Sequence, residues 1–304
     1  MLDHRSLPST ASRIPVIGLL LVMVAPTSRS IPSVPDSVGD APARHTEDYD
    51  ANRWVGDSYY VDSTHGSDSW DGRSPWTAWR TLQRVREHEE FEPGDAILLA
   101  RGSVWREELR VPASGSEEHP LLFTSYGSGP KPLILGSDVV DGWDETQREG
   151  VFVAPVAWKP TQVFEADARM IKVAFEGGKG VPDLAPGTWT WDEANARMFL
   201  APAEEGPPKA GSIEISRRST AIEGHHESYI IVHGIAVGRA RLHGVSVNDG
   251  SHWVVDDVTA WGNWLYGVKA GPGASDVRIS NSRATDNLIG VGGFDVSGLV
   301  IRGN

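Results

Sequence analysis

A repeat of 23 residues near the C-terminus limits what this chain can fold into. Gly-Val pairs begin at Gly244, Gly267 and Gly290, and Ala221-Ile222 extends the series backwards. A second set of β-branched residues keeps nearly the same spacing, and it consists of Val232, Val255, Ile279 and Ile301. A repeat of this length indicates a solenoid, because one unit buries its apolar residues only by stacking on its neighbours.

The residue types within the repeat favour β-strands. Short runs of Val and Ile alternate with Gly, Asn and Asp, and Leu242, Leu265 and Leu288 share the 23-residue interval. Parallel strands that stack about 4.8 Å apart place each Val or Ile over its equivalent. A leucine-rich repeat needs its own Leu and Asn spacing, which is missing here. We therefore predict an all-β chain that forms a right-handed parallel β-helix with about 23 residues per coil.

The N-terminal residues predict export. Within residues 1–30, two arginines precede the apolar run Ile14–Ala25, which is the order of a secretory signal peptide. A retained membrane anchor and a buried strand are the alternatives, although twelve apolar residues are short for a membrane span. Residues 31–57 are rich in Pro, Ser and Asp, so we expect a disordered linker.

Three further segments follow the linker. Residues 58–136 place apolar side chains at helical spacing over Thr77–Glu89 and then form strands, which predicts an N-terminal capping helix and the first coils. Residues 137–216 break the rhythm, and we predict an antiparallel β insertion there. Residues 217–304 hold the remaining coils.

Charge and cysteine content exclude several classes of partner. The net charge of -13 excludes sequence-independent binding of nucleic acid, which needs a basic surface. It also opposes polyanionic glycans unless a basic patch or Ca²⁺ reverses the sign locally. The chain has no Cys, so it has no disulfide and no thiolate metal site. We expect a monomer in the bacterial periplasm or outside the cell, with no membrane span after signal cleavage.

One N-terminal motif carries a family resemblance. The segment YYVDSTHGSDSWDGRSPWTAWRTLQRVRE, with the strands that follow it, resembles the N-terminal part of secreted right-handed β-helix proteins of the pectate-lyase-like superfamily. The resemblance covers roughly 58–136 and 213–304. It implies a carbohydrate-facing groove, whereas fold alone does not name a reaction. Such proteins usually have more coils, so we expect a truncated chain whose incomplete helix leaves catalytic residues beyond Asn304.

The resemblance leaves the reaction open. It implies a polysaccharide lyase or a glycoside hydrolase that acts on plant or algal cell-wall polysaccharide. The alternative is a non-catalytic module that binds glycans or has a structural role at the cell surface.

Lys269 is the first catalytic candidate. A lyase needs a base that removes the proton beside a uronate carboxyl group. Lys269 points outward if Val268 points inward, and its neighbours on adjacent coils, Ser246 and Gly292, leave space for a ligand. The alternative is an exposed lysine that contributes to solubility.

Two further pairs of residues are catalytic candidates. His243 and Tyr266 are 23 residues apart and should stack as a possible base and acid, with an aromatic ladder as the alternative. Asp249 and Asp295 are 46 residues apart, or two coils, which approximates the carboxylate separation of inverting glycosidases. Solvated turn aspartates are the alternative for that pair.

Three aromatic residues in one turn are candidates for substrate binding. Flat rings on a groove make good platforms for sugars, and they also bury well in a core. The three residues are Trp261, Trp264 and Tyr266.

Two sets of side chains are candidate cation ligands. Asp256 and Asp257, followed one coil later by Ser280 and Asn281, offer oxygen ligands for Ca²⁺. The alternative is that these side chains form turns through bonds to the local backbone. The second set contains three histidines, which are His225, His226 and His233. The sequence shows neither a fixed geometry nor a nearby set of carboxylate ligands for them, which does not favour a metal site.

Overall fold

The computed structural model describes residues 55–175 and 180–304. The expected signal peptide and nearly all of the expected linker lie outside these residues. The described chain is built almost entirely from β-strands, with a 3-10 turn at η2 (Pro75–Thr77) and one short helix, α1 (Leu82–Arg86). None of its helices is long and apolar enough to cross a membrane.

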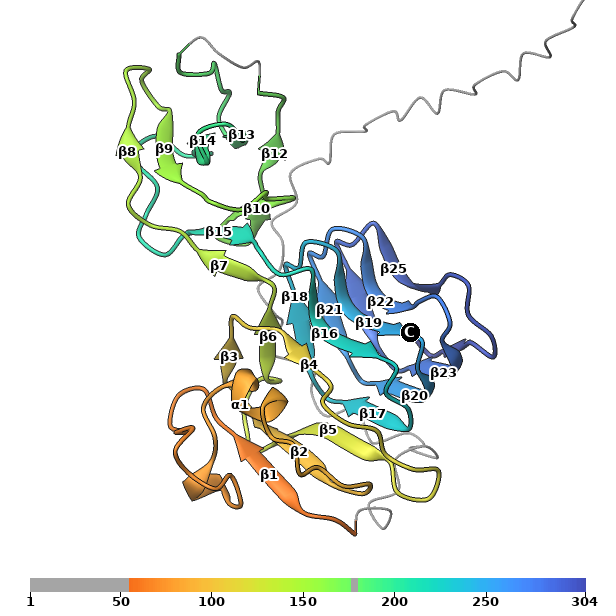
Figure 1. Ribbon diagram of the computed structural model, residues 1–304. Coiled ribbons are helices and arrows are strands. Elements are labelled where there is room, and N and C mark those ends of the chain that lie inside the picture. Colours follow the sequence, from red (N-terminus) through yellow and green to blue (C-terminus); the bar gives the residue numbers. More distant parts are fainter. Residues whose placement is uncertain (1–54, 176–179) are drawn as a thin grey trace, which may run out of the picture. The chain divides into compact units, whose positions relative to one another are not determined.

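Three parallel sheets form the β-helix (Figure 1). Sheet A contains, in order, β1 (Ser58–Val61), β2 (Ala96–Ala100), β5 (Leu121–Tyr126), β17 (Ile230–His233), β20 (Ser251–Asp256), β23 (Ser275–Ser280) and β26 (Val300–Arg302). Sheet B contains β24 (Arg283–Thr285), β21 (Thr259–Trp261), β18 (Ala236–Gly238), β6 (Leu133–Leu135) and β3 (Val104–Trp105). Sheet C contains β25 (Ile289–Gly293), β22 (Tyr266–Ala270), β19 (His243–Asn248), β16 (Thr220–His225) and β4 (Leu109–Arg110).

The chain visits the three sheets in a fixed order. From β16 onward, each coil contributes one strand to sheet C, then one to sheet A, then one to sheet B. Equivalent strands of successive coils pair in parallel, so the parallel β-helix predicted from the repeat is confirmed. This arrangement gives every inner strand a hydrogen-bonding neighbour on both sides.

Apolar side chains at paired positions form the core of the β-helix. Val232 pairs with Val255, which pairs with Ile279, and all three side chains are fully buried. The leucine series behaves differently, because Leu242 and Leu288 lie on the surface. The interval that these leucines share therefore reflects equivalent turn positions and not a second row of core residues.

The predicted helix over Thr77–Glu89 is much shorter in the structure. Trp79 forms a parallel β-bridge with Val61, so the chain is still extended there. The Asp68 carboxylate then accepts hydrogen bonds from the backbone of residues 80 and 81. The Thr81 hydroxyl accepts from the Arg84 amide and caps the helix, which begins only at Leu82.

Two mainly antiparallel sheets lie between β6 and β16 in the chain. One contains β11 (Ala168–Arg169), β10 (Val163–Glu165), β15 (Ile213–Ser216) and β7 (Ser137–Val139). The other contains β12 (Ile171–Lys172), β13 (Thr188–Asp192), β14 (Arg197–Ala201), β9 (Phe152–Pro155) and β8 (Asp144–Glu145). They enclose a separate apolar core that includes Trp189, Leu200 and Ile213. We call this part of the chain the inserted segment.

Buried polar contacts join the inserted segment to the turn that enters sheet C. Arg239, in the turn between β18 and β19, contacts Glu214 at 2.9 Å and Asp167 at 2.8 Å. The Gln162 amide donates a hydrogen bond to the Ala240 carbonyl at 2.8 Å. The inserted segment is thereby fixed beside the turn from which β19 of sheet C starts.

Candidate functional site

The outer face of sheet C carries a row of side chains in register. Glu223 pairs with Ser246, Ser246 with Lys269, and Lys269 with Gly292. Arg110 of β4 extends this row on the other side of Glu223. We call these five residues the polar row. Successive side chains of a strand point to opposite faces, so the buried neighbours of the row face the core while the row itself faces outward.

Two carboxyl groups meet at one end of the polar row. Glu108 and Glu223 both lie beside Arg110, and burial together with the neighbouring Glu223 raises the pKa of Glu108. The Arg110 guanidinium opposes the shift, because its Nε lies 3.2 Å from a Glu108 oxygen and 3.5 Å from a Glu223 oxygen. The result is a pair of neighbouring carboxyl groups in which the pKa of Glu108 is raised.

Lys269 lies between the small residues that the repeat predicts. Ser246 and Gly292 are its paired neighbours, and its Nζ donates to the Asn248 side-chain oxygen at 3.0 Å. Burial lowers the pKa of Lys269, and the charge of Glu223 opposes this. The lysine is therefore a hydrogen-bond donor on the same face as the two carboxyl groups.

His243 and Tyr266 are paired on adjacent strands, with ring centroids 5.5 Å apart. Burial, assisted by the charge of Lys269, lowers the pKa of His243 to about 4. The imidazole is therefore neutral near pH 7 and is a weaker base than an exposed histidine. Its buried Nδ1 has no hydrogen-bond partner among the described residues.

Asp249 and Asp295 lie at equivalent exposed turns, each with a positive φ. Gly273 lies between them, since its amide donates to the Asp295 carbonyl and its Cα faces a carboxylate oxygen of Asp249. Asp249 instead makes an ion pair with His225, at 3.6 Å between Oδ2 and Nδ1. The turn position and this ion pair favour turn aspartates over an acid and base pair.

The three aromatic candidates occupy different surroundings. The Trp261 ring lies on sheet B and covers Gly238, so it is half-buried. Trp264 is 46% exposed in the turn that leads to sheet C, and Tyr266 begins β22 on that sheet. Trp264 and Tyr266 are consequently the rings available to a ligand where the strands of sheet C begin.

The proposed calcium ligands already have protein partners. One Asp256 oxygen accepts from Ser280 and Asn281 at 2.8 and 2.7 Å, and the other lies 3.0 Å from His233 Nδ1. Asp257 accepts from a lysine, Lys131, at 2.8 Å. Because protein donors use these oxygens, the geometry does not favour Ca²⁺ there.

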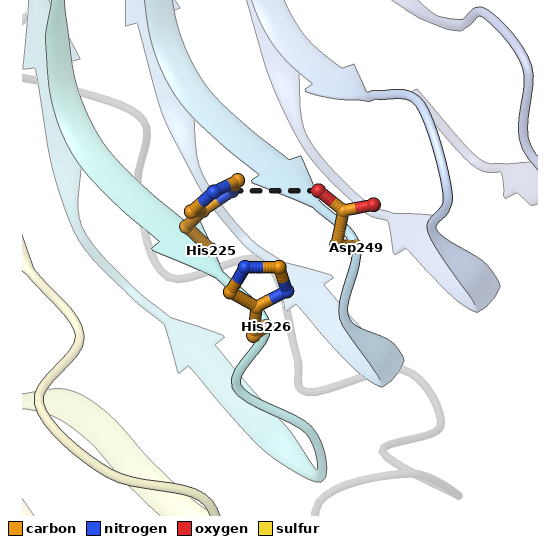
Figure 2. A group of neighbouring side chains, drawn as sticks. All are labelled: His225, His226 and Asp249. Atoms are coloured by element: carbon orange, nitrogen blue, oxygen red, sulfur yellow. Dashed lines mark ion pairs between the residues drawn. The ribbon is translucent and has the colours of Figure 1, made fainter.

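Two of the three histidines that the sequence suggested as metal ligands lie together with an aspartate. His225 and His226 lie next to Asp249 (Figure 2), whereas His233 lies with Asp256. The ligand atoms of the first three residues all fall within 4.8 Å of one another.

Comparisons with known proteins give the same fold. No model of a known protein family matches the sequence. A lacto-N-biosidase from Bifidobacterium longum subsp. longum is 31% identical over 102 residues, which are 32% of this chain and 6% of that protein. The structure of XylC in complex with xylose has a TM-score of 0.56 and 14% identity, covering 80% of this chain and 56% of that chain. A structure described as a glycoside hydrolase has a TM-score of 0.55 and 11% identity, covering 75% and 65%.

The coverage of these relatives is partial, because the chain spans less than two thirds of each. Together with the three stacked parallel sheets, the likeness decides the architecture. The fold is a parallel β-helix. In this β-helix the polar row lies on the outer face of sheet C.

Sequence reasoning missed the carboxyl pair of this β-helix. The inserted segment separates Glu108 and Arg110 from Glu223 in the chain, so counting in steps of 23 does not show that their strands lie on adjacent coils. A signal was present, because Leu109-Arg110 and Ile222-Glu223 share the order of a core residue followed by a charged one. Comparing the strands on either side of the inserted segment would have aligned them.

Proposed function

We propose that the outer face of sheet C binds a glycan and that Glu108 and Glu223 are the acid and the nucleophile of a glycoside hydrolase. The observation that carries the proposal is the paired carboxyl groups, of which Glu108 has a raised pKa. Glycosidases commonly use two carboxyl groups in unlike protonation states. The likeness to a lacto-N-biosidase and to a structure described as a glycoside hydrolase supports hydrolysis over elimination.

The reaction follows from these two roles. Protonated Glu108 donates its proton to the glycosidic oxygen while the bond from that oxygen to the anomeric carbon breaks. The Glu223 carboxylate attacks the same carbon and forms a glycosyl ester. Glu108 then takes a proton from water, whose oxygen displaces Glu223 and regenerates both groups. One nitrogen of Arg110 contacts an oxygen of each carboxyl group, at 3.2 and 3.5 Å. Such proximity suits a retaining enzyme, whose carboxyl groups lie about 5 Å apart, better than an inverting one, where they lie about 9 Å apart.

Other residues of the same face suit substrate binding. Lys269 offers a donor to sugar hydroxyls or carboxylates, and Tyr266 with Trp264 offers ring surface at the edge of the sheet. Lys269 is therefore a binding residue in this proposal, and not the base of a lyase. The alternative function is glycan binding without catalysis, which the 46% exposure of Trp264 favours.

The test uses the full chain with aryl xylosides, a lacto-N-biose aryl glycoside, xylan, pectate and alginate. We expect new reducing ends without the ultraviolet absorbance of a double bond, and retention of configuration in the first product seen by proton NMR. Glu108→Gln and Glu223→Gln should each lower kcat by about 100-fold or more. Glu193→Gln, at an exposed turn of the inserted segment, is the matched control and should leave the rate unchanged.

Three results would contradict the proposal. Elimination products would identify a lyase, and binding without any product would identify a glycan-binding module. Full turnover by both glutamine variants would remove the carboxyl pair from the reaction. We also propose, from the N-terminal sequence, that the protein is secreted and acts on cell-wall polysaccharide. Assays of its activity in culture medium and in cell fractions test the secretion.

A further inference from the structure

A cluster of two histidines and one aspartate lies at the end of strands β16 and β19 (Figure 2). Each of the three side chains is exposed, and one ligand atom from each lies within 4.8 Å of the others. The rings of His225 and His226 are 4.1 Å apart between centroids. His225 Nδ1 is 3.6 Å from Asp249 Oδ2. Among the described residues this is the one such group of three.

The backbone holds the three side chains on two adjacent coils. His225 pairs with Asn248, the residue before Asp249, and the His226 amide donates to the Asn248 carbonyl at 3.0 Å. His226 and Asp249 both adopt a positive φ, at 82° and 52°. Such values are uncommon for residues other than glycine, and Asn, Asp and His adopt them more readily than most. The hydrogen-bonded ladder therefore sets the positions from which the three side chains start.

The ligand types match a divalent transition metal. Zn²⁺ binds imidazole nitrogen at about 2.0–2.1 Å and carboxylate oxygen at about 2.0–2.2 Å, so ligands in a tetrahedral site lie about 3.3 Å apart. The contact between His225 and Asp249 is already close to that value. The three side chains are exposed, so rotamer changes can bring the remaining ligand atoms, which lie within 4.8 Å of one another, closer together. Ca²⁺ is a poorer match, because it prefers six to eight oxygen ligands.

We propose that His225, His226 and Asp249 bind Zn²⁺. Three protein ligands leave one coordination position open, as in zinc sites that hold water or a ligand. His225 lies two residues after Glu223 on the same strand, so the site opens on the face of sheet C that carries the polar row. The ion also joins one coil to the next, because the histidines and the aspartate come from successive coils.

The test measures binding to the full chain without an affinity tag. Calorimetric titration with Zn²⁺ should give one site with a dissociation constant below about 100 µM. Co²⁺ should produce the visible absorption of a four-coordinate site, and Ca²⁺ should not compete. His225→Gln, His226→Asn and Asp249→Asn should each weaken binding by about ten-fold or more. Zn²⁺ should raise the melting temperature of the wild-type chain and not that of these variants.

The matched control is His252→Asn. His252 also has a positive φ and lies 3.9 Å from an aspartate, Asp276, but the cluster of three does not include it. This variant should bind Zn²⁺ as tightly as the wild-type chain. Circular dichroism of each variant without metal shows whether it is folded. Binding weaker than about 100 µM, or equal affinity in the three ligand variants and the control, would overturn the proposal.

Discussion

Replacing Glu214 by glutamine should lower stability in a way that depends on pH. Both oxygens of Glu214 accept from Arg106 at 2.8 Å, Arg239 contacts one of them at 2.9 Å, and Ser137 donates at 2.6 Å. Burial opposes ionisation, but these partners outweigh it and hold the pKa of Glu214 at about 2. The variant keeps two arginines close to a side chain that no longer balances their charge.

The pKa of Glu214 gives the size of the expected loss of stability. The shift from 4.5 to about 2 corresponds to about 3 kcal/mol of stability for the ionised carboxylate. Since the pKa is lower in the folded chain, the contribution is fully present above the unfolded pKa and is lost as the pH falls toward the folded one. At pH 3 about 2 kcal/mol of it is gone. The loss of a partner from a buried ion pair costs a similar amount, about 3–5 kcal/mol.

Urea unfolding at pH 7 and at pH 3 measures the effect. We expect Glu214→Gln to be about 3 kcal/mol less stable than wild type at pH 7 and only about 1 kcal/mol less stable at pH 3. Other carboxyl groups titrate in both proteins, so the difference between them isolates Glu214. If the variant and the wild-type chain lose stability in parallel as the pH falls, the buried ion pairs do not contribute as the structure indicates.

Two further predictions concern sheet C and its core. Gly224→Ala should lower the free energy of unfolding, measured with urea, by about 1–3 kcal/mol, because a Cβ at that position would meet the ring of Trp253. A variant as stable as the wild-type chain would contradict this packing. NMR titration of His243 should give a pKa near 4. Because the pKa is about 6.5 in the unfolded chain, loss of this proton makes the folded chain more stable as the pH rises from about 4 to 6.5. A measured pKa near 6.5 would show that the imidazole is not buried.

The repeat predicted the β-helix because residues at equal intervals occupy equivalent places in successive coils. Val245 and Val268 face the core at paired positions, and Lys269 lies outward beside Val268. A shared interval does not by itself mean burial, because Leu242 keeps the interval but lies in a turn that leaves it 38% exposed. Periodicity identifies equivalent positions, but the direction of a side chain depends on whether its residue lies in a strand or a turn.

The candidate site was harder to predict for a different reason. The carboxyl pair joins Glu108 to Glu223 across the inserted segment, so their separation in the sequence does not show that they lie on adjacent coils. The partners of Asp256 could not be predicted either, because the sequence does not show that Ser280 and Asn281 donate hydrogen bonds to one of its oxygens. Sequence spacing gives proximity between coils, whereas ligand capacity depends on which lone pairs remain unused.

Residues 136–219 connect β6 of sheet B to β16 of sheet C. One coil later, residues 239–242 make the same connection between β18 and β19 with a short turn. Strand β16 nevertheless pairs directly with β4, and Ile222 lies beside Leu109 as if nothing intervened. This corner can therefore accept a whole folded unit without a change in the register of the core. Exchanging or removing that unit would change what adjoins the turn between sheets B and C while leaving the pairing of the stacked coils unchanged.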